Sequence, residues 1–153
     1  MVKAVKEMLL KKVDDSLVGH PFCLSARYVN LDKDYPMLTE WWRAWDWDVM
    51  EREFLPKIGM IISEGDTDIC AAFLWLTDSK IAIMEMFISN PDVRGRIRGE
   101  ALDVLVTSLK STARRLGYGA VYTTTDHKHV IHRLEKDGFH RSKDNIVSLM
   151  GRV

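Results

Sequence analysis

The sequence lacks the features that mark several classes of protein. It has two cysteines, Cys23 and Cys70, and their wide separation argues against a zinc finger or a disulfide scaffold. No apolar run approaches the ~20 residues of a membrane-spanning helix, and the run near the N-terminus is too short for a signal peptide. The 22 basic and 22 acidic residues cancel, so overall charge favours neither nucleic acid nor a membrane surface. We therefore expect a cytoplasmic protein that binds neither.

The composition that remains is typical of a globular domain. Of the 153 residues, 46% are hydrophobic and 29% are charged, and no repeat or low-complexity stretch appears. We predict a single domain over residues 1–153, in which residues 1–20 form an N-terminal extension.

Hydrophobic periodicity and turn residues predict an α/β (α+β) fold. Strands are expected at residues 22–31, 57–64, 69–77, 81–89, 120–125, 139–142 and 145–151. Helices are expected at residues 34–47, 49–54, 100–116 and 126–137. A three-strand meander followed by alternating helices and strands gives a mixed, mostly antiparallel central sheet of about six or seven strands, with helices on both faces.

One loop, NPDVRGRIRG at residues 90–99, carries a pattern suited to binding an anion. It leads into a helix, whose N-terminus offers unpaired backbone N–H groups and a partial positive charge to a phosphate. Glycines let the backbone come close to such a group, and arginines add charge-assisted hydrogen bonds. A surface turn with solvated arginines explains these residues equally well. The GxGxxG and P-loop motifs are both absent.

Two stretches of the chain resemble the GNAT superfamily of acetyl-CoA-dependent N-acyltransferases. The run FISNPDVRGRIRGEALDVL is similar to that family's Q/R-x-x-G-x-G/A motif, which begins a helix after the fourth strand. The run GYGAVYTTTDHKHVIHRLEKDGF is similar to its second signature, which ends in E-K-x-G-F. The order of predicted elements also agrees over about residues 22–150.

The resemblance implies that acetyl-CoA is a co-substrate. The fourth and fifth strands would separate, and the pantetheine arm would lie between them. Backbone groups of Phe87, Ile88 and Ser89 would pair with pantetheine or polarise the thioester. The pyrophosphate would bind the backbone of Arg94, Gly95, Arg96, Ile97, Arg98, Gly99 and Glu100.

Three positions depart from the family's pattern. Ile97 replaces a glycine of the loop, which leaves its N–H available only if its φ is negative. Leu134 stands where a tyrosine often protonates the leaving thiolate. His127 stands at a coenzyme-contacting position that is often asparagine. His132 or His127 is a candidate substitute acid, and without one the reaction is slowed but not prevented.

Other polar residues have candidate roles in accepting an amine. Glu85 on the fourth predicted strand is a candidate base, although an edge or outward-facing carboxylate fits the pattern better. Asp126 is expected to cap a helix. His129 and His132 share a helical face, but no third ligand is evident, so we expect no metal site.

The tryptophans gather in one predicted helix. Trp41, Trp45 and Trp42 fit a buried helix face. Beyond them, Trp47, Asp46 and Asp48 are candidates to line a pocket for a cationic acceptor, because acidic groups attract an ammonium.

Three functions follow from these patterns. The first is an acetyl-CoA-dependent N-acetyltransferase whose acceptor is an amine, either a small molecule or a protein, and which is a monomer or a homodimer. The second is a catalytically degenerate GNAT-fold binding or structural protein, which the departures at Ile97 and Leu134 favour. Nucleic-acid binding through the arginines is a third, and the zero net charge argues against it.

Overall fold

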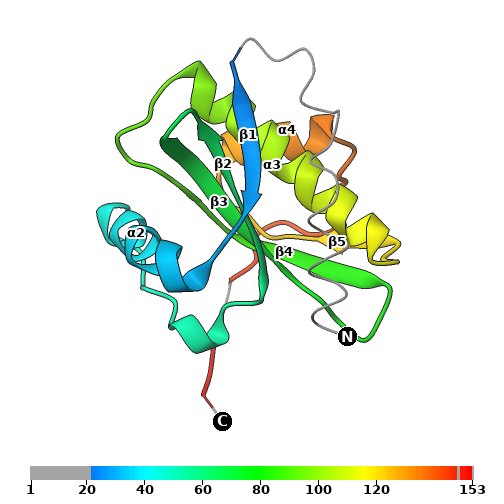
Figure 1. The fold of residues 1–153 in the computed structure, drawn as a ribbon. Coiled ribbons are helices and arrows are strands. Elements are labelled where there is room, and N and C mark those ends of the chain that lie inside the picture. The colour runs from blue at the N-terminus through cyan, green and yellow to red at the C-terminus, as the bar shows by residue number, and fades with distance from the viewer. Residues whose placement is uncertain (1–21, 148, 153) are drawn as a thin grey trace.

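The computed structural model describes residues 22–147 and 149–152, and this part of the chain contains one five-stranded sheet. Its strands are β1 (Leu24–Tyr28), β2 (Ile58–Glu64), β3 (Thr67–Trp75), β4 (Ile81–Ser89) and β5 (Ala120–Tyr122). They lie in the order β1-β2-β3-β4-β5, and each of the first four is antiparallel to its neighbour (Figure 1). Only β5 is parallel, to β4. The predicted N-terminal extension lies outside the described residues.

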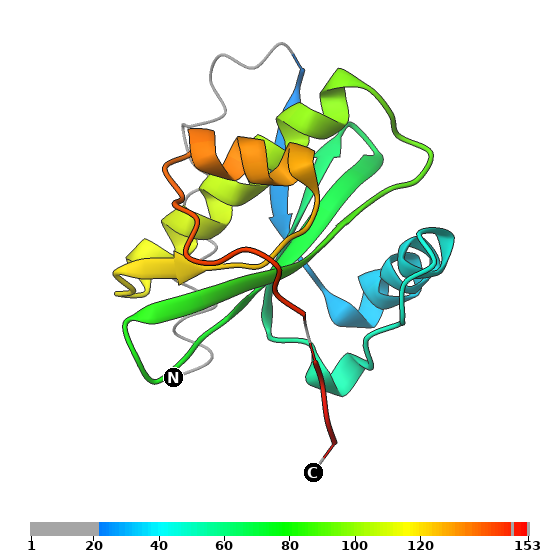
Figure 2. The ribbon, with the colours of Figure 1, turned by 180° about the vertical axis from the view of Figure 1, so that it is seen from behind.

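Helices cover both faces of the sheet, as predicted. They are α2 (Leu31–Ala44), α3 (Arg96–Arg115) and α4 (Lys128–Lys136), with a short 3-10 helix, η2 (Arg52–Phe54). One core cluster joins the sheet to α3 and α4, and a second joins the opposite face to α2 (Figure 2). Side chains alternate between the faces, so Met60 and Ile62 belong to the first cluster and Ile61 to the second.

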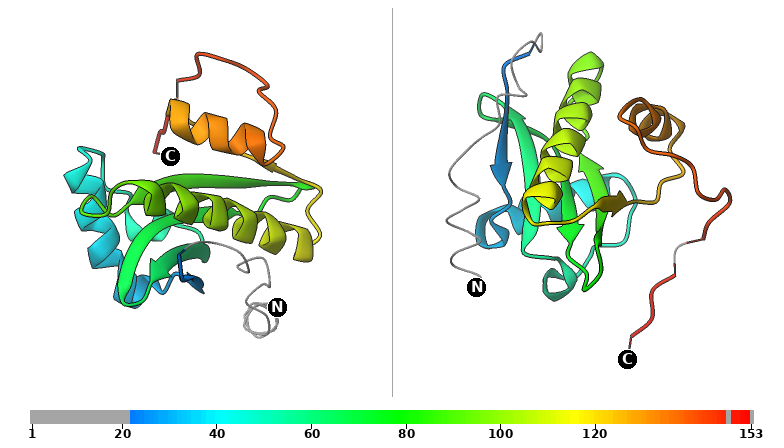
Figure 3. Two further views of the ribbon diagram at one scale, coloured as in Figure 1. Left: turned by 90° about the horizontal axis from the view of Figure 1, so that it is seen from above. Right: turned by 90° about the vertical axis from the view of Figure 1, so that its right-hand side faces the viewer.

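The helix α4 lies alongside α3 (Figure 3). Two ion pairs join them, between Arg133 and Asp103 and between Lys110 and Asp137. Leu134 is 5% exposed and belongs to the core cluster that α3 forms with the sheet. Helix α4 is therefore held in place both by ion pairs to α3 and by apolar packing against the core.

The sheet has fewer strands than the sequence predicts. Residues 139–142 and the described parts of 145–151 form no strand, and β5 ends at Tyr122 rather than at residue 125. Strand formation requires a neighbouring edge as well as apolar residues, and the three-residue β5 provides a short one. Val147 and Leu149 are 76% and 89% exposed, so they gain nothing from the sheet.

The helix boundaries also differ from the predicted ones. The first helix begins at Leu31 because Asn30 caps it by accepting a hydrogen bond from the Asp32 N–H at 3.0 Å. It ends at Ala44, so Trp45 is 39% exposed, and the prediction that Trp45 belongs to the buried face is wrong. The predicted helix at 49–54 is only the three residues of η2.

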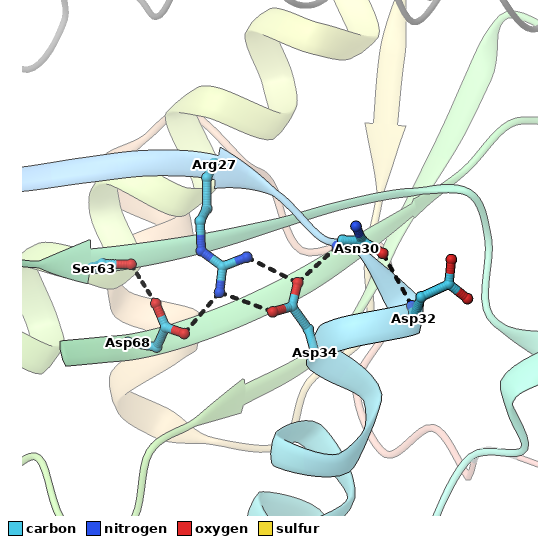
Figure 4. A network of polar contacts seen from close by, with 6 residues as sticks. All are labelled: Arg27, Asn30, Asp32, Asp34, Ser63 and Asp68. Carbon is cyan, nitrogen blue, oxygen red and sulfur yellow. Dashed lines mark hydrogen bonds and ion pairs between the residues drawn. The ribbon is translucent and has the colours of Figure 1, made fainter. Parts of the chain in front are cut away.

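A polar network fixes the junction between β1 and α2 (Figure 4). Arg27 on β1 donates to both carboxylate oxygens of Asp34 in α2, at 2.8 and 3.0 Å, and to Asp68 on β3 at 2.7 Å. Asp34 also accepts from the Asn30 N–H, and Ser63 donates to Asp68. One guanidinium therefore ties the first helix to two strands.

The structure also bears on the cysteines and on whether a helix could span a membrane. Cys23 and Cys70 are both free thiols, the first exposed and the second buried in the core. None of the helices in the described ranges is long and apolar enough to cross a membrane.

Candidate functional site

The strands β4 and β5 pair over a short stretch and then separate. Their three residue pairs are Ile81 with Ala120, Ala82 with Val121, and Ile83 with Tyr122. Since β4 continues to Ser89, its last six residues have no strand partner on the β5 side within the described chain. Phe87, Ile88 and Ser89, whose backbone groups the resemblance assigns to pantetheine, lie in this second half of β4.

A β-bulge lies in the same half of β4. The register changes between Ala71 and Phe73 of β3, which pair with Ile88 and Glu85, so that β4 contains one extra residue. Met86 has φ 60, a left-handed conformation that is uncommon outside glycine. A bulge turns backbone groups out of the regular ladder. The half of β4 that has no partner on the β5 side is therefore irregular at the point where the resemblance expects contact with a thioester.

The arginine-rich loop leads directly into the N-terminus of α3, which begins at Arg96. Gly95 is the N-cap, with φ 77 and ψ −151, and no side chain caps the helix there. Ile97 lies in the first turn with helical backbone, and its half-buried side chain packs against the core. Its φ is therefore negative, and the isoleucine does not prevent its N–H from contributing to an anion site.

The loop arginines differ in their surroundings. Arg94 is exposed, and Arg96 forms an exposed ion pair with Glu100 at 3.4 Å. The guanidinium of Arg98 lies over the indole ring of Trp45, 5.4 Å from its centroid. Because α3 begins at Arg96, both Arg96 and Arg98 lie in its first turn, where their charge adds to that of the helix dipole.

A fourth arginine reaches the same turn from α4. The guanidinium of Arg133 lies against Gly99, where an added Cβ would collide with it. Gly99 therefore makes room for Arg133, a role that the sequence did not suggest. Arg133 is paired with Asp103, so it contributes a partly neutralised charge. No local pattern could have identified it, because the contact joins residues on two different helices.

The candidate base Glu85 lies where β4 and β5 diverge. Its Oε1 accepts hydrogen bonds from the backbone N–H of Thr124 at 2.6 Å and from the Thr124 hydroxyl at 2.9 Å. Burial raises the pKa of Glu85, and the two bonds from Thr124 oppose this only in part. The carboxylate is half-buried rather than outward-facing, and its proton affinity is raised, as a base that takes a proton from an ammonium requires.

The histidines of the C-terminal half lie on the surface. His127 is the N-cap of α4, but its side chain makes no capping hydrogen bond, and His132 on the same helix is exposed. Asp126 precedes the N-cap, so the prediction that it caps this helix is wrong. No cluster of three or more metal-ligating side chains occurs in the described residues.

The candidate acceptor residues follow directly after α2. Asp46, Trp47 and Asp48 are all exposed, and Asp46 has φ 56. The preceding residue, Trp45, donates its indole N–H to the carbonyl of Ser89 at 2.8 Å. The end of α2 is thereby attached to the end of β4, which brings the acidic residues to the side of the molecule that contains the loop.

Comparison with known proteins supports the resemblance at the level of the fold. By sequence, no family profile and no curated protein matches the chain. By structure, it is similar to a protein of Thermus thermophilus, with a TM-score of 0.63 and 17% identity over 84% of this chain and 98% of that one. It is also similar to a protein of Klebsiella pneumoniae described as an acyl-CoA N-acyltransferase, with a TM-score of 0.62 and 17% identity over 83% and 89%.

A third similar structure is the N-acetylglutamate synthase of Neisseria gonorrhoeae, which was solved with coenzyme A and N-acetyl-glutamate. Its TM-score is 0.63 at 15% identity, and the match covers 78% of this chain but 29% of that one. At such low identities the likeness defines the fold. The chain has the GNAT fold, as the resemblance predicted.

Proposed function

We propose that the protein is an acetyl-CoA-dependent N-acetyltransferase that acts on an amine acceptor. The observation that carries this proposal is the divergence of β4 and β5 next to the N-terminus of α3. The divergence leaves backbone groups without a strand partner along one side of β4, and the N-terminus of α3 provides free amides and arginines. Together they suit a long coenzyme in which a pantetheine arm separates the thioester from a diphosphate.

The residues present fit the coenzyme's diphosphate. Gly95 leaves the N-terminus of α3 without a side-chain cap, so backbone N–H groups of the first turn remain for an anion. Arg94, Arg96 and Arg98 add guanidinium donors. Backbone groups of β4 from Phe87 to Ser89 would hold the pantetheine arm, except that the Ser89 carbonyl is already engaged by Trp45.

Direct transfer requires a neutral amine beside the thioester carbon. Glu85 would take one proton from the bound ammonium, using the carboxylate that Thr124 holds in place. The amine nitrogen then forms a bond to the acetyl carbon, the carbon–sulfur bond breaks, and the thiolate leaves with its electron pair. The remaining amine proton passes to the thiolate or to solvent. General acid–base assistance of this kind contributes about 10²–10⁴-fold.

The acid side of the reaction is weaker than in the family that the chain resembles. Leu134, at the position of the usual tyrosine, is buried and cannot donate a proton. His132 and His127 on α4 are exposed, and either would serve if the coenzyme brings the sulfur near it. A coenzyme A thiolate leaves at neutral pH without an acid, only more slowly. We expect a slow enzyme.

The acceptor is proposed to be a cationic amine. Asp46 and Asp48 attract an ammonium, and Trp47 adds an exposed aromatic face for its apolar part or for a cation–π contact. Both small amines and protein amines fit this description.

Thermal denaturation with and without acetyl-CoA tests the proposal. A ligand present at 100 times its dissociation constant stabilises the folded state by about 2.7 kcal/mol, so the melting temperature should rise. Release of free thiol in the presence of a panel of amines would then report turnover. The proposal is wrong if millimolar acetyl-CoA leaves the melting temperature unchanged.

One observation favours a second function, a GNAT-fold protein that binds coenzyme A without catalysis. Leu134 is a buried core residue at the position where the resemblance expects a tyrosine acid. This alternative predicts the same thermal shift as the enzyme. It differs by showing no thiol release above the uncatalysed rate with any amine in the panel.

A further inference from the structure

Trp45 makes two contacts that join different parts of the candidate site. It is the C-cap residue of α2, and its indole N–H donates to the carbonyl of Ser89, the last residue of β4, at 2.8 Å. The face of the same ring lies under the guanidinium of Arg98, with 5.4 Å between the guanidinium carbon and the ring centroid. One side chain therefore touches the end of β4 and the first turn of α3.

Arg98 is the one loop arginine that is held by an aromatic ring. The exposed Arg96 is paired with the half-buried carboxylate of Glu100 at 3.4 Å, and no aromatic contact of Arg94 is found in the described chain. A guanidinium held over an indole by a cation–π contact donates no hydrogen bond in that contact, so its N–H groups are not used up by the ring. Arg98 has no ion pair in the described chain, so these donors remain available to an anion.

The hydrogen bond to Ser89 gives the indole a fixed orientation. Trp45 is 39% exposed, and a tryptophan so exposed would sample several rotamers if its N–H were bonded only to water. The Ser89 carbonyl selects one of them. The orientation of the ring then determines where the guanidinium of Arg98 lies, at a helix N-terminus that already favours a negative charge.

We propose that Trp45 is a positioning residue that holds the guanidinium of Arg98 at the N-terminus of α3 for the diphosphate of the coenzyme. The inference rests on the proposed function, because it assumes that the anion bound there is coenzyme A. It assigns to Trp45 a role in binding the coenzyme rather than the acceptor. In this role Trp45 acts through Arg98.

A double-mutant cycle on coenzyme A affinity tests the inference. Trp45→Leu removes the ring and the N–H, and we expect the dissociation constant to rise by about 3- to 20-fold, as loss of a partly buried cation–π contact predicts. In an Arg98→Ala background the same substitution should change it less than about 2-fold, because no guanidinium remains to be positioned. Isothermal titration calorimetry with coenzyme A measures all four proteins.

Two further variants of Trp45 refine the test. Trp45→Phe retains an aromatic face but lacks the N–H that bonds to the Ser89 carbonyl, so we expect it to recover only part of the affinity that Trp45→Leu loses. Trp45→Met fills similar space without a π face and should resemble Trp45→Leu, so that a second variant without the ring is available if one fails to fold. Thermal melts confirm that each variant is folded.

The matched control is Phe54→Leu. Phe54 is also an exposed aromatic residue under an arginine, with 5.5 Å between its ring centroid and the guanidinium carbon of Arg152, but it lies on η2. We expect its coenzyme A affinity to equal that of the wild type. An equal loss of affinity in Trp45→Leu with and without Arg98 overturns the inference, and so does no loss at all. If instead the wild type itself fails to bind coenzyme A, the proposed function is what fails.

Discussion

Gly95 has a backbone conformation that other residues rarely adopt. Its φ of 77 and ψ of −151 place it in a region reserved almost wholly for glycine, at a cost of about 1–3 kcal/mol for any other residue. No atom lies within 4 Å of a Cβ added there, so the cost comes from the backbone alone. The conformation of this residue sets the direction in which the chain enters α3, and with it the direction of the first N–H groups.

We predict that Gly95→Ala lowers the free energy of unfolding by about 1–3 kcal/mol and also weakens coenzyme A binding. Urea denaturation and calorimetry measure the two effects. Gly65→Ala is the matched control, because Gly65 also has a positive φ, 56, and open space, but lies in the turn between β2 and β3. The account is contradicted if the two variants bind coenzyme A equally well.

Glu85 links the chemistry of the site to the stability of the fold. Burial raises its pKa above the ordinary 4.5, so the folded protein retains this proton to a higher pH than the unfolded chain does. The favourable contribution of protonated Glu85 to the free energy of unfolding is complete below pH 4.5. It is lost as the pH rises through the pKa that Glu85 has in the folded protein. Glutamine cannot ionise, and its Oε1 can still accept the bonds from Thr124.

Glu85→Gln should therefore be at least as stable as the wild type at pH 7, and this advantage should shrink toward pH 4. Its kcat/KM should fall by about 10²-fold or more, because glutamine cannot take a proton. Urea denaturation at several pH values and thiol release measure the two properties. A variant that is less stable at pH 7 and fully active would show that the carboxylate is structural.

At the scale of elements, the network around Arg27 fixes α2 against the sheet. Burial alone would raise the pKa of Asp34, but hydrogen bonds from Arg27 and from the Asn30 N–H lower it below its ordinary 3.8. The stabilisation that ionised Asp34 provides is therefore complete above the pKa of this residue in the unfolded chain. It is lost as the pH falls through its pKa in the folded protein. Arg27 is 42% exposed, so solvent screening reduces the energy of this pair.

We predict that Asp34→Asn costs about 1–2 kcal/mol of unfolding free energy at pH 7, measured by urea denaturation. The difference from the wild type should shrink as the pH falls from 3.8 through the lower folded pKa of Asp34, where the wild-type carboxylate also loses its charge. Asp66→Asn is the control, since Asp66 is an exposed acid in the turn between β2 and β3. Equal stability of both variants at pH 7 would show that the network contributes nothing.

The elements that the sequence predicted well are those with long apolar runs between clear turns. Residues 81–89 form β4 as predicted, and β2 and β3 agree within two residues at each end. The prediction of two C-terminal strands was wrong because an apolar pattern favours a strand but does not show whether a sheet edge is available to pair with it. The start of α2 was missed because Asn30 caps it from outside the periodic run.

The same contrast holds within the candidate site. The glycines and arginines of the loop were predictable because they are adjacent in the sequence and directly precede a helix. Arg133 and Trp45 were not, because each reaches the loop from a different element. Thr124 belonged to a run of three threonines, and only the folded chain shows which of them holds Glu85.

At the scale of the whole molecule, the fold provides two regions, one suited to the diphosphate of coenzyme A and one suited to its thioester. The first turn of α3 provides charge and amides, whereas β4 from Glu85 onward provides a carboxylate, a bulge and unpaired backbone. The end of α2 connects these regions through Trp45 and is followed by the acidic residues proposed for the acceptor. The account depends on both regions binding one molecule.

A crystal structure of the protein with coenzyme A tests that dependence most directly. We predict that the diphosphate lies within hydrogen-bonding distance of the N–H groups at the start of α3, near Arg98, and that the pantetheine arm runs between β4 and β5 toward Glu85. Coenzyme A bound elsewhere, or a thiol that points away from β4, would contradict the account.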